Sequence, residues 1–509
     1  MMKNSNLDRA FLGHPKPLSS LFSLEIWERF SYYGIRALLV FFMTASVLDG
    51  GLGLSREYAS AVVGVFAGAL YLATLPGGYI ADNYLGQKRA VFMGAVVVAL
   101  GHLSIAFSYF YSFMFYIGLV LIVIGTGFFK PCSSVMVGML YKKEDTRRDA
   151  GFTLFYMGIN IGALIAPIIC GFFSDKYGYH IGLGIGGLGM LIALAVFYFK
   201  TIPAFDEFEK EVGLNGSWKE PARKQGFVKY LFIGFILLVA IFTALCAIGI
   251  ISLNPVLIAT YMTIIIALAS LAYFIFLLFL PSISLDEKKG LVPFVVLFVA
   301  SCFFWSVFEQ QPTTYNLFAK DFMDRSIFGF EIPAAWFQSL NSLFILIIAP
   351  LLSFLWLFLA NRKKDPDSIS KFILGLVFAG LSFLIMYFAA SYVTASEDSS
   401  GNFAKVSYMW MVASLFCLTV GELCLSPVGM SVMTKIAPKI LQNQVMGLFF
   451  VSISLGNLVA GLIGGGVNLE NIKNLPDIFM DCVIMLFVVA LVVLLIKKPI
   501  YTLLKTDKI

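Results

Sequence analysis

Charged residues are scarce in this chain, and their scarcity decides its class. Only 13% of the 509 residues are Asp, Glu, Lys or Arg, about half of the quarter that is usual in soluble domains. With 59% hydrophobic residues, a water-soluble globule of this size could not cover its surface with polar groups. Disordered and fibrous chains are also excluded, because 16% of the residues are aromatic and the 44 glycines follow no fixed period. The composition is that of a polytopic membrane protein.

Catalytic and cofactor-binding motifs are missing as well. The sequence has no Walker phosphate loop, no His-Glu-Xaa-Xaa-His zinc motif and no Gly-Xaa-Ser-Xaa-Gly nucleophile elbow. Its seven cysteines are odd in number, lie in apolar stretches and show neither disulfide nor metal-ligand spacing. We therefore expect no enzymatic activity, no metal and no bound cofactor. Without a nucleotide-binding domain, ion coupling is the expected energy source for transport.

What the chain has instead is a series of long apolar runs. A helix needs about 20 mostly apolar residues to cross a membrane. The sequence predicts fourteen such helices, at residues 22–47, 57–81, 90–108, 113–137, 150–174, 181–199, 227–249, 255–280, 291–319, 333–360, 372–394, 407–436, 442–466 and 477–496.

The positive charges orient these helices. If the N-terminus is cytoplasmic, 27 of the 36 Lys and Arg residues fall in cytoplasmic segments and 6 in external ones, as the positive-inside rule requires. The net charge of +6 is thus explained by membrane orientation and does not indicate nucleic-acid binding. Both termini are predicted to be cytoplasmic.

The longest polar interruption divides the chain into two halves. It follows six predicted helices and precedes eight, of which the first two carry no ionisable residue in their interiors. The sequence therefore predicts an all-α fold of two six-helix bundles with two extra helices between them. The expected parts are a tail at 1–21, a first bundle at 22–200, a linker at 201–226, the extra helices at 227–280, a second bundle at 291–496 and a tail at 497–509.

Seven charged side chains in the predicted helices stand out as candidates, because a charge there is costly and functional by default. A charge at the membrane centre costs about 2.5–3.5 kcal/mol on insertion scales. The seven are Glu25, Glu28, Arg29, Arg36, Lys130, Glu309 and Glu422. Three cations and four carboxylates nearly balance, which suits a proton-coupled site, because a carboxylate can exchange a proton for a cationic partner.

The first predicted helix carries the densest group of these charges. At about 100° per residue, six side chains share one face of it, namely Glu25, Glu28, Arg29, Tyr32, Tyr33 and Arg36. Such a one-sided polar face on a membrane helix contacts protein or water and not lipid. The alternative, that the charges only mark the helix end, suits the Glu pair better than Arg36, which is two turns deeper.

The other polar positions allow more than one interpretation. Lys130 either lines a pathway or reaches toward the interface, and Glu309 and Glu422 either act in transport or form structural ion pairs. Both carboxylates lie near prolines that are expected to interrupt their helices, namely Pro312 and Pro427. Three neutral side chains are candidates either for substrate binding or for interhelical packing. They are the amides of Asn160 and Asn341 and the ring of Tyr71.

Several segments, read in order, resemble one known family. The segment Glu25-Ile-Trp-Glu-Arg-Phe-Ser-Tyr-Tyr-Gly34 resembles the signature of the proton-dependent oligopeptide transporters, a family of the major facilitator superfamily. Further segments similar to the family's patterns are Gly78–Arg89, Gly125–Pro131, Phe155–Ala163, Phe308–Gln310 and Glu422–Pro427. The similarity runs from about residue 22 to 460, with two extra helices as in bacterial members. This resemblance implies a location in the inner (plasma) membrane of a bacterium.

The resemblance implies a function and a role for each matching residue. It implies proton-coupled import of di- and tripeptides by one chain in a lipid bilayer, with protons as the coupling ion. Arg29, Tyr33 and Lys130 would hold the peptide carboxylate, whereas Asn160, Asn341 and Glu422 would hold its amino terminus. Arg36 and Glu309 would form a gating ion pair, and Glu25 and Glu28 would couple proton movement to Lys130. The wider substrate-binding set also includes Arg36, Tyr71, Ser426 and Phe449.

The chain departs from the family pattern at a few positions. Asn83, Ala163 and Ser342 stand where Arg, Ser and Pro are common, and Phe449 takes the place of a frequent Trp in the side-chain pocket. Within the family, transport of amino acids, nitrate or other small anions is the alternative function. A channel or a membrane enzyme fits less well, because the charges differ from helix to helix and no nucleophile or metal cluster is present.

Overall fold

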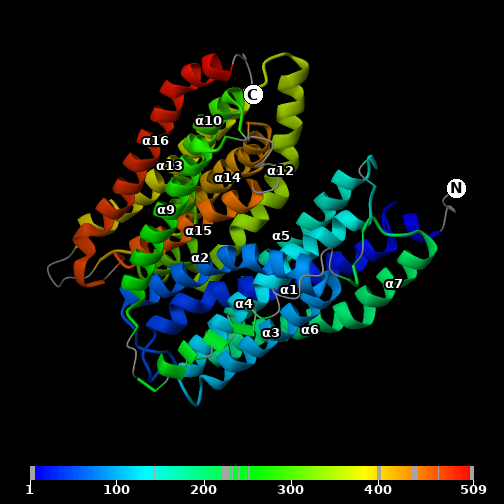
Figure 1. Ribbon diagram of the computed structural model, residues 1–509. Helices are drawn as coiled ribbons and strands as arrows, with labels where there is room; N and C mark the ends of the chain where they lie inside the picture. Colours follow the sequence, from blue (N-terminus) through cyan, green and yellow to red (C-terminus); the bar gives the residue numbers. More distant parts are fainter. Residues whose placement is uncertain are drawn as a thin grey trace. The chain divides into compact units, whose positions relative to one another are not determined.

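The computed structural model consists almost entirely of helices (Figure 1). It describes residues 6–142, 144–216, 218–220, 230, 233–234, 237–238, 241–242, 244–246, 248–249, 253–281, 283–397, 403–436, 445–467 and 469–504. The chain forms two compact units. Unit 1 comprises residues 1–38, 45–52 and 69–253, and unit 2 comprises 39–44, 53–68 and 254–509. Helices α1 and α2 therefore contribute residues to both units, whereas the domain boundaries expected from the sequence stay a prediction.

Unit 1 contains the helices of the first half of the chain. Its elements are η1 (Asn6–Arg9), α1 (Lys16–Thr44), α2 (Arg56–Ile80), η2 (Ala81–Leu85), α3 (Gln87–Phe107), α4 (Phe113–Met139), α5 (Arg148–Tyr177), α6 (Tyr179–Val196), η3 (Phe197–Thr201) and α7 (Ile202–Glu211), with the last part of α1 and the first part of α2 assigned to unit 2. Helices α3 and α4 pack closely because glycines face each other. A Cβ on Gly94 would lie 2.7 Å from the carbonyl oxygen of Gly125.

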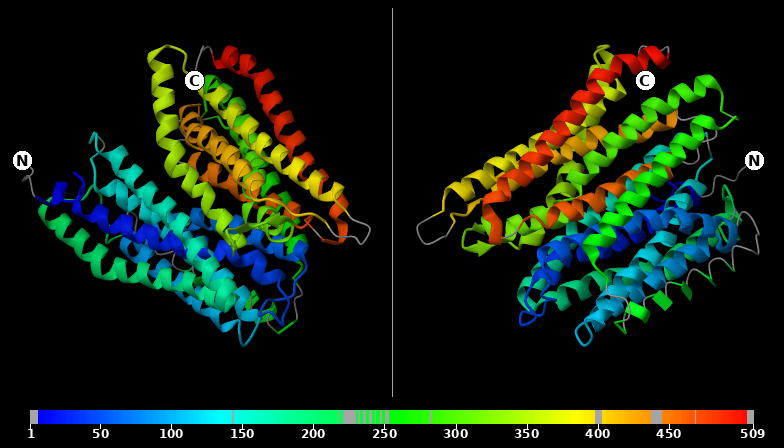
Figure 2. Two further views of the ribbon diagram at one scale, coloured as in Figure 1. Left: turned by 180° about the vertical axis from the view of Figure 1, so that it is seen from behind. Right: turned by 60° about the vertical axis from the view of Figure 1, so that its left-hand side comes forward.

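Unit 2 contains the remaining helices and two small sheets. Its helices are α9 (Pro255–Phe279), α10 (Leu285–Phe308), η4 (Gln311–Tyr315), α11 (Asn316–Phe322), η5 (Ala334–Phe337), α12 (Gln338–Asn361), α13 (Ser368–Ala395), α14 (Met409–Ile436), α15 (Val445–Gly464), η7 (Leu469–Asn474) and α16 (Leu475–Leu504). Strands β1 (Met323–Asp324) and β4 (Val406–Ser407) pair in parallel, and β2 (Ser326–Ile327) and β3 (Phe330–Glu331) form a hairpin. Helices α13 and α16 lie side by side in both figures (Figures 1 and 2).

Capping side chains fix where several unit 2 helices begin. Asn254 accepts hydrogen bonds from the first amides of α9, and Pro255 occupies the first helical position, where it needs no amide partner. Ser284 and Glu287 form a reciprocal capping box at the start of α10. The carboxylate of Asp367 accepts the amide hydrogen bond of Ser370 at the start of α13.

The predicted membrane helices are largely confirmed. Among the described residues, twelve helices are long and apolar enough to cross a membrane. The first predicted span corresponds to α1, whose charged residues, among them Glu25, Glu28, Arg29 and Arg36, make it the least apolar of the long helices of unit 1. About half of the residues of the predicted span at 227–249 lie outside the described residues. The second extra span is α9, most of whose residues are exposed or half-buried. Its Ala259 packs with Ala61 and Leu458, and its Phe274 packs against Phe294 and Phe298 of α10.

The expected helix breaks at proline are confirmed at one site and wrong at another. Near Pro312, α10 ends at Phe308, and the chain continues through Glu309 and Gln310 into the π-helix η4. At Pro427, helix α14 continues without a break. A proline removes one amide donor, and in α14 the surrounding helix tolerates that loss, whereas in the Glu309 segment the chain changes its helical hydrogen-bonding pattern.

Candidate functional site

The predicted polar face of α1 forms a buried charged cluster in unit 1. Glu25, Glu28, Arg29 and Arg36 are all buried, with 2–7% of each residue exposed. The guanidinium of Arg29 lies between the two carboxylates: its Nε is 3.2 Å from Oε1 of Glu25, and its Nη2 donates to Oε1 of Glu28 at 2.8 Å. The helical spacing places Glu25 one turn before Arg29, so one cation pairs with two carboxylates of its own helix.

Aromatic rings extend this cluster along the helix. The guanidinium of Arg29 lies 5.5 Å from the ring centre of Tyr32, and that of Arg36 lies 5.9 Å from the ring centre of Tyr33. Cation–π contacts of this length stabilise a cation away from bulk water. The prediction that these side chains share one face of the first helix is therefore confirmed by their contacts.

Lys130 of α4 is a further cation of unit 1. Its ammonium group lies 4.1 Å from the ring centre of Tyr71 on α2. Lys130 is partly buried and precedes Pro131, but α4 continues through this proline. Unit 1 thus brings together cations and carboxylates from α1 and α4 with an aromatic ring from α2.

Asn160 of α5 is buried, but its donor group is engaged within its own helix. Its Nδ2 donates to the carbonyl oxygen of Tyr156 at 3.0 Å. This contact is of the local kind that a polar side chain makes in an apolar helix. The alternatives of a packing role and a binding role stay open for this residue.

In unit 2, an acidic group and an amide meet across two helices. Nδ2 of Asn341 on α12 donates to Oε2 of Glu422 on α14 at 3.1 Å and to Oγ1 of Thr419 at 3.0 Å. Glu422 is only partly buried. The family resemblance assigned Asn341 and Glu422 to the same terminus of the peptide, and the structure shows that they contact each other directly. Their carboxylate and amide oxygens can accept hydrogen bonds from an ammonium group.

Glu309, Ser426 and Phe449 occupy other positions of unit 2. Glu309 is 4% exposed and caps the end of α10, where the chain leaves the α-helix before η4. Ser426 is partly buried one turn after Glu422 on α14. The ring of Phe449 on α15 packs edge-on against Trp305 of α10, with ring centres 6.2 Å apart.

Sequence reasoning missed two polar contacts in unit 2. Thr419, which binds the Asn341 amide, lies one turn before Glu422, so its spacing from this carboxylate could have drawn attention to it. Arg56 and Asp321 form an ion pair of 2.6 Å, and both are largely buried. In the predicted topology Arg56 is one of the six external cations, and no sequence pattern indicated a partner 265 residues away.

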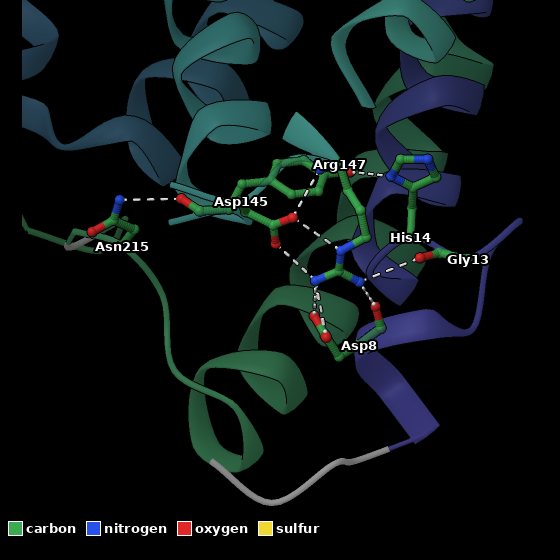
Figure 3. A network of polar contacts seen from close by, with 7 residues as sticks. Asp8, Gly13, His14, Asp145, Arg147 and Asn215 are labelled. Atoms are coloured by element: carbon green, nitrogen blue, oxygen red, sulfur yellow. Dashed lines mark hydrogen bonds and ion pairs between the residues drawn. The ribbon is translucent and has the colours of Figure 1, made fainter. Parts of the chain in front are cut away.

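A second polar network lies in unit 1 outside the membrane-spanning segments (Figure 3). Arg147 contacts Asp145 and Asp8, and its Nη1 donates to the carbonyl oxygens of Asp8 and Gly13. Nδ1 of His14 lies 2.8 Å from the hydroxyl of Tyr141. Burial and the nearby Arg147 lower the pKa of His14. The network joins the N-terminal segment to the loop between α4 and α5.

Buried ionisable side chains on membrane-spanning helices are typical of transport proteins, and the comparison with known proteins agrees. The POT family model matches residues 88–213 and 231–475, and the chain belongs to this family. It is 51% identical to the peptide transporter YePEPT of Yersinia enterocolitica over 97% of this chain and 96% of that protein. It is 34% identical to the di-/tripeptide transporter of Lactococcus lactis over 98% of both chains.

Solved structures of the same family share the fold. One structure, a peptide transporter POT in complex with sulfate, has a TM-score of 0.86 and 34% identity and covers 97% of both chains. Another, a POT family transporter in complex with 5-aminolevulinic acid, has a TM-score of 0.85 and 31% identity and covers 97% of this chain and 98% of its own. The protein is therefore an integral membrane transporter of the major facilitator type and not an enzyme.

Proposed function

We propose that the protein is a proton-coupled symporter that imports di- and tripeptides by alternating access. The observation that carries this proposal is the unequal distribution of intramembrane charge. Unit 1 holds Arg29, Arg36 and Lys130 with two carboxylates, whereas the expected intramembrane charges of unit 2 are the carboxylates of Glu309 and Glu422. A zwitterionic peptide offers one terminus to each type of group.

The peptide carboxylate binds the cationic group of unit 1. Arg29 is already paired with Glu25 and Glu28, so its charge is largely compensated before substrate arrives. The ammonium group of Lys130 lies over the Tyr71 ring, and an ammonium group can donate hydrogen bonds to a carboxylate. Lys130 therefore binds the peptide carboxylate together with Arg29 and Tyr33, and Arg36 and Tyr71 complete the group.

The peptide ammonium group binds the acidic group of unit 2. The Asn341 amide positions the Glu422 carboxylate through its 3.1 Å hydrogen bond, and Glu422 supplies the charge that the ammonium needs. The family resemblance also assigns Asn160, which lies on α5 of unit 1, to the peptide ammonium group. Phe449, with Ser426, lines the side-chain pocket, where the Phe ring beside Trp305 favours apolar peptide side chains.

Proton coupling uses the remaining carboxylates. Glu25 and Glu28 share one guanidinium, so a proton taken up by either changes the charge available to Arg29 and Lys130. Glu309 lies at the junction of α10 and η4. A change in its charge therefore acts at the point where the helical hydrogen-bonding pattern changes. The family resemblance assigns Glu309 and Arg36 to one gating ion pair, and we propose that protonation of Glu309 opens this pair and permits the change of access.

Uptake into proteoliposomes under an imposed inward proton gradient tests the proposal. Labelled dipeptide accumulates in vesicles with the wild-type chain, and unlabelled dipeptide or tripeptide competes, whereas free amino acid and nitrate do not. Glu309→Gln abolishes gradient-driven accumulation, whereas Glu331→Gln, the same change at an exposed carboxylate, leaves it intact. Equal accumulation with and without the gradient would contradict proton coupling.

A different competition pattern identifies the alternative function. If nitrate or a free amino acid competes and dipeptides do not, the chain carries small anions or amino acids. The relative crystallised with 5-aminolevulinic acid makes this compound a necessary competitor in the same assay.

A further inference from the structure

A basic pocket opens on the surface of unit 1, apart from the buried charges described above. It has a volume of about 450 Å³ and is lined by Lys88, Arg89, Phe92, Met93, Tyr198, Ile202 and Lys219. These residues come from the first two turns of α3, from η3 and the start of α7, and from the linker after α7. The pocket therefore lies where the membrane spans Gln87–Phe107 and Tyr179–Glu211 meet the polar linker.

The linker is fixed against α3 and completes the pocket. The backbone amide of Lys88 donates to the carbonyl oxygen of Trp218 at 2.8 Å. The Trp218 indole is fully buried against Phe205, with ring centres 5.1 Å apart, and the ammonium of Lys88 lies 4.7 Å above it. Because Trp218 anchors this stretch, the next residue, Lys219, has a defined place in the pocket wall.

The pocket carries more positive than negative charge. Lys219 contacts Asp206 at 2.9 Å and Glu209 at 2.7 Å, and Lys88 is 3.6 Å from Asp206. Two carboxylates thus face three cations. Arg89 is exposed and forms no ion pair within the part of the chain that the structure describes. A guanidinium in this position can make two parallel hydrogen bonds to a phosphate.

Apolar side chains form the rest of the wall. Phe92, Met93 and Tyr198 are 36%, 38% and 55% exposed, and the rings of Phe92 and Tyr198 contact each other at 6.2 Å. A phosphate ion alone would leave this apolar surface uncovered. A molecule with an anionic head and an apolar body would cover both parts of the pocket at once.

We propose that this pocket binds the headgroup of an anionic phospholipid. The phosphate contacts Arg89, Lys88 and Lys219, and the glycerol and upper acyl chains lie on Phe92, Met93 and Tyr198. Basic pockets between membrane helices recognise anionic headgroups in this way. The orientation predicted from the positive charges places this lipid in the cytoplasmic leaflet. The site is independent of the proposed peptide function.

Native mass spectrometry of the full chain in detergent tests the proposal. Phosphatidylglycerol and zwitterionic phosphatidylcholine are titrated separately against the wild type, Arg89→Gln/Lys219→Gln, and the control Lys142→Gln/Lys210→Gln. The control removes two exposed cations of unit 1 that do not line the pocket. We expect the wild type to prefer phosphatidylglycerol, the pocket variant to bind it about tenfold more weakly, and the control to bind as the wild type does.

Two further measurements separate a lipid site from a simple anion site and from a folding defect. Inorganic phosphate is added as a competitor, and we expect it to displace phosphatidylglycerol only in large excess. Arg89→Gln alone, which breaks no ion pair among the described residues, weakens binding in part. The proposal is overturned if both lipids bind equally, if the control loses as much affinity as the pocket variant, or if phosphate competes at equal concentration.

Discussion

At the scale of single residues, burial of charge separates functional side chains from structural ones. The sequence identified seven ionisable residues within predicted membrane helices, because a charge there is costly unless it has a partner or a function. For Arg29 the structure shows partners on its own helix, at spacings that the sequence could predict. The contact between Asn341 and Glu422 joins residues 81 positions apart, and no local pattern could predict it.

The first residue-scale prediction concerns Lys130. Lys130→Ala removes the cation that the proposal assigns to the peptide carboxylate, and a hydrogen bond to a charged group is worth about 1.5–3 kcal/mol. We expect dipeptide affinity to fall by about tenfold to a hundredfold, measured by competition in proteoliposomes. Lys130→Arg keeps the charge and retains part of this affinity. Lys142→Ala, an exposed lysine of the same unit, serves as the control and changes nothing.

The second residue-scale prediction concerns Glu422. Glu422→Gln keeps the shape of the side chain and removes the charge assigned to the peptide ammonium group. We expect the affinity for a dipeptide to fall by about tenfold or more, whereas an N-acetylated dipeptide, which has no ammonium group, binds equally weakly to both proteins. Ser342→Ala, next to Asn341, is the control. A variant that loses affinity for both ligands to the same degree would argue that Glu422 is structural.

At the scale of elements, the sequence located the helices better than it located their breaks. Each predicted span that the structure describes has a helix, because length and hydropathy depend on many residues together. The span predicted at 291–319 is divided into α10, η4 and α11. Proline alone could not indicate this, since Pro427 lies inside the unbroken α14. Neighbouring packing decides whether a proline ends a helix, and that packing is non-local.

The close approach of α2 and α15 in unit 2 gives an element-scale prediction. A Cβ on Gly64 would lie 2.8 Å from Cα of Gly461 and 2.7 Å from the carbonyl oxygen of Asn457. Because these neighbours are backbone atoms, Gly64→Ala forces the helices apart, and overpacking of this kind costs about 1–3 kcal/mol. We expect a lower Tm in detergent. Gly184→Ala in α6, where a Cβ meets nothing within 4 Å, leaves Tm unchanged or raises it.

The network around Arg147 gives a prediction of pH dependence for the N-terminal segment. Burial and Arg147 lower the pKa of His14 below its ordinary value of 6.5, whereas the hydrogen bond from Arg147 lowers the pKa of Asp145. The docked segment thus favours neutral His14, so docking is strongest above pH 6.5 and weakens as the pH falls toward the lowered pKa. Asp145 stays ionised over this range.

A spin label at Asn6→Cys, in a background without native cysteines, measures this docking. We expect label mobility to increase between about pH 7.5 and pH 5.5 in the otherwise native protein. In His14→Gln, which is neutral at every pH, mobility should not change over the same range. A pH response that survives in His14→Gln would assign the effect to another group and contradict the argument.

At the scale of the whole molecule, composition alone predicted the class, and the ordered motifs predicted the family. Low charge and long apolar runs define a polytopic membrane protein whatever its detailed contacts. The assignment of Leu39–Thr44 and Gly53–Gly68 to unit 2 was beyond the sequence, because it depends on contacts such as that of Gly64 with Gly461. Hydropathy predicts where a helix lies along the chain but not which other helices it contacts.

The orientation of the chain is the whole-molecule property that the charge distribution predicts. With 27 of 36 cations on one side, inserting the protein the opposite way would place these cations on the external face, against the positive-inside rule. Single cysteines test this in a background without the seven native cysteines, which are all free. Leu48→Cys and Phe328→Cys, both almost fully exposed, are expected outside, and Lys142→Cys and Lys210→Cys inside.

A membrane-impermeant maleimide applied to intact cells should therefore label the first two positions and spare the other two. All four positions are exposed in the structure, so each should react once the membrane is opened with detergent, which controls for local shielding. The inverse pattern would reverse the orientation. A mixed pattern, with Lys142→Cys and Lys210→Cys on different sides, would mean an odd number of crossings between α4 and α7, and the predicted six-helix first bundle would then be wrong.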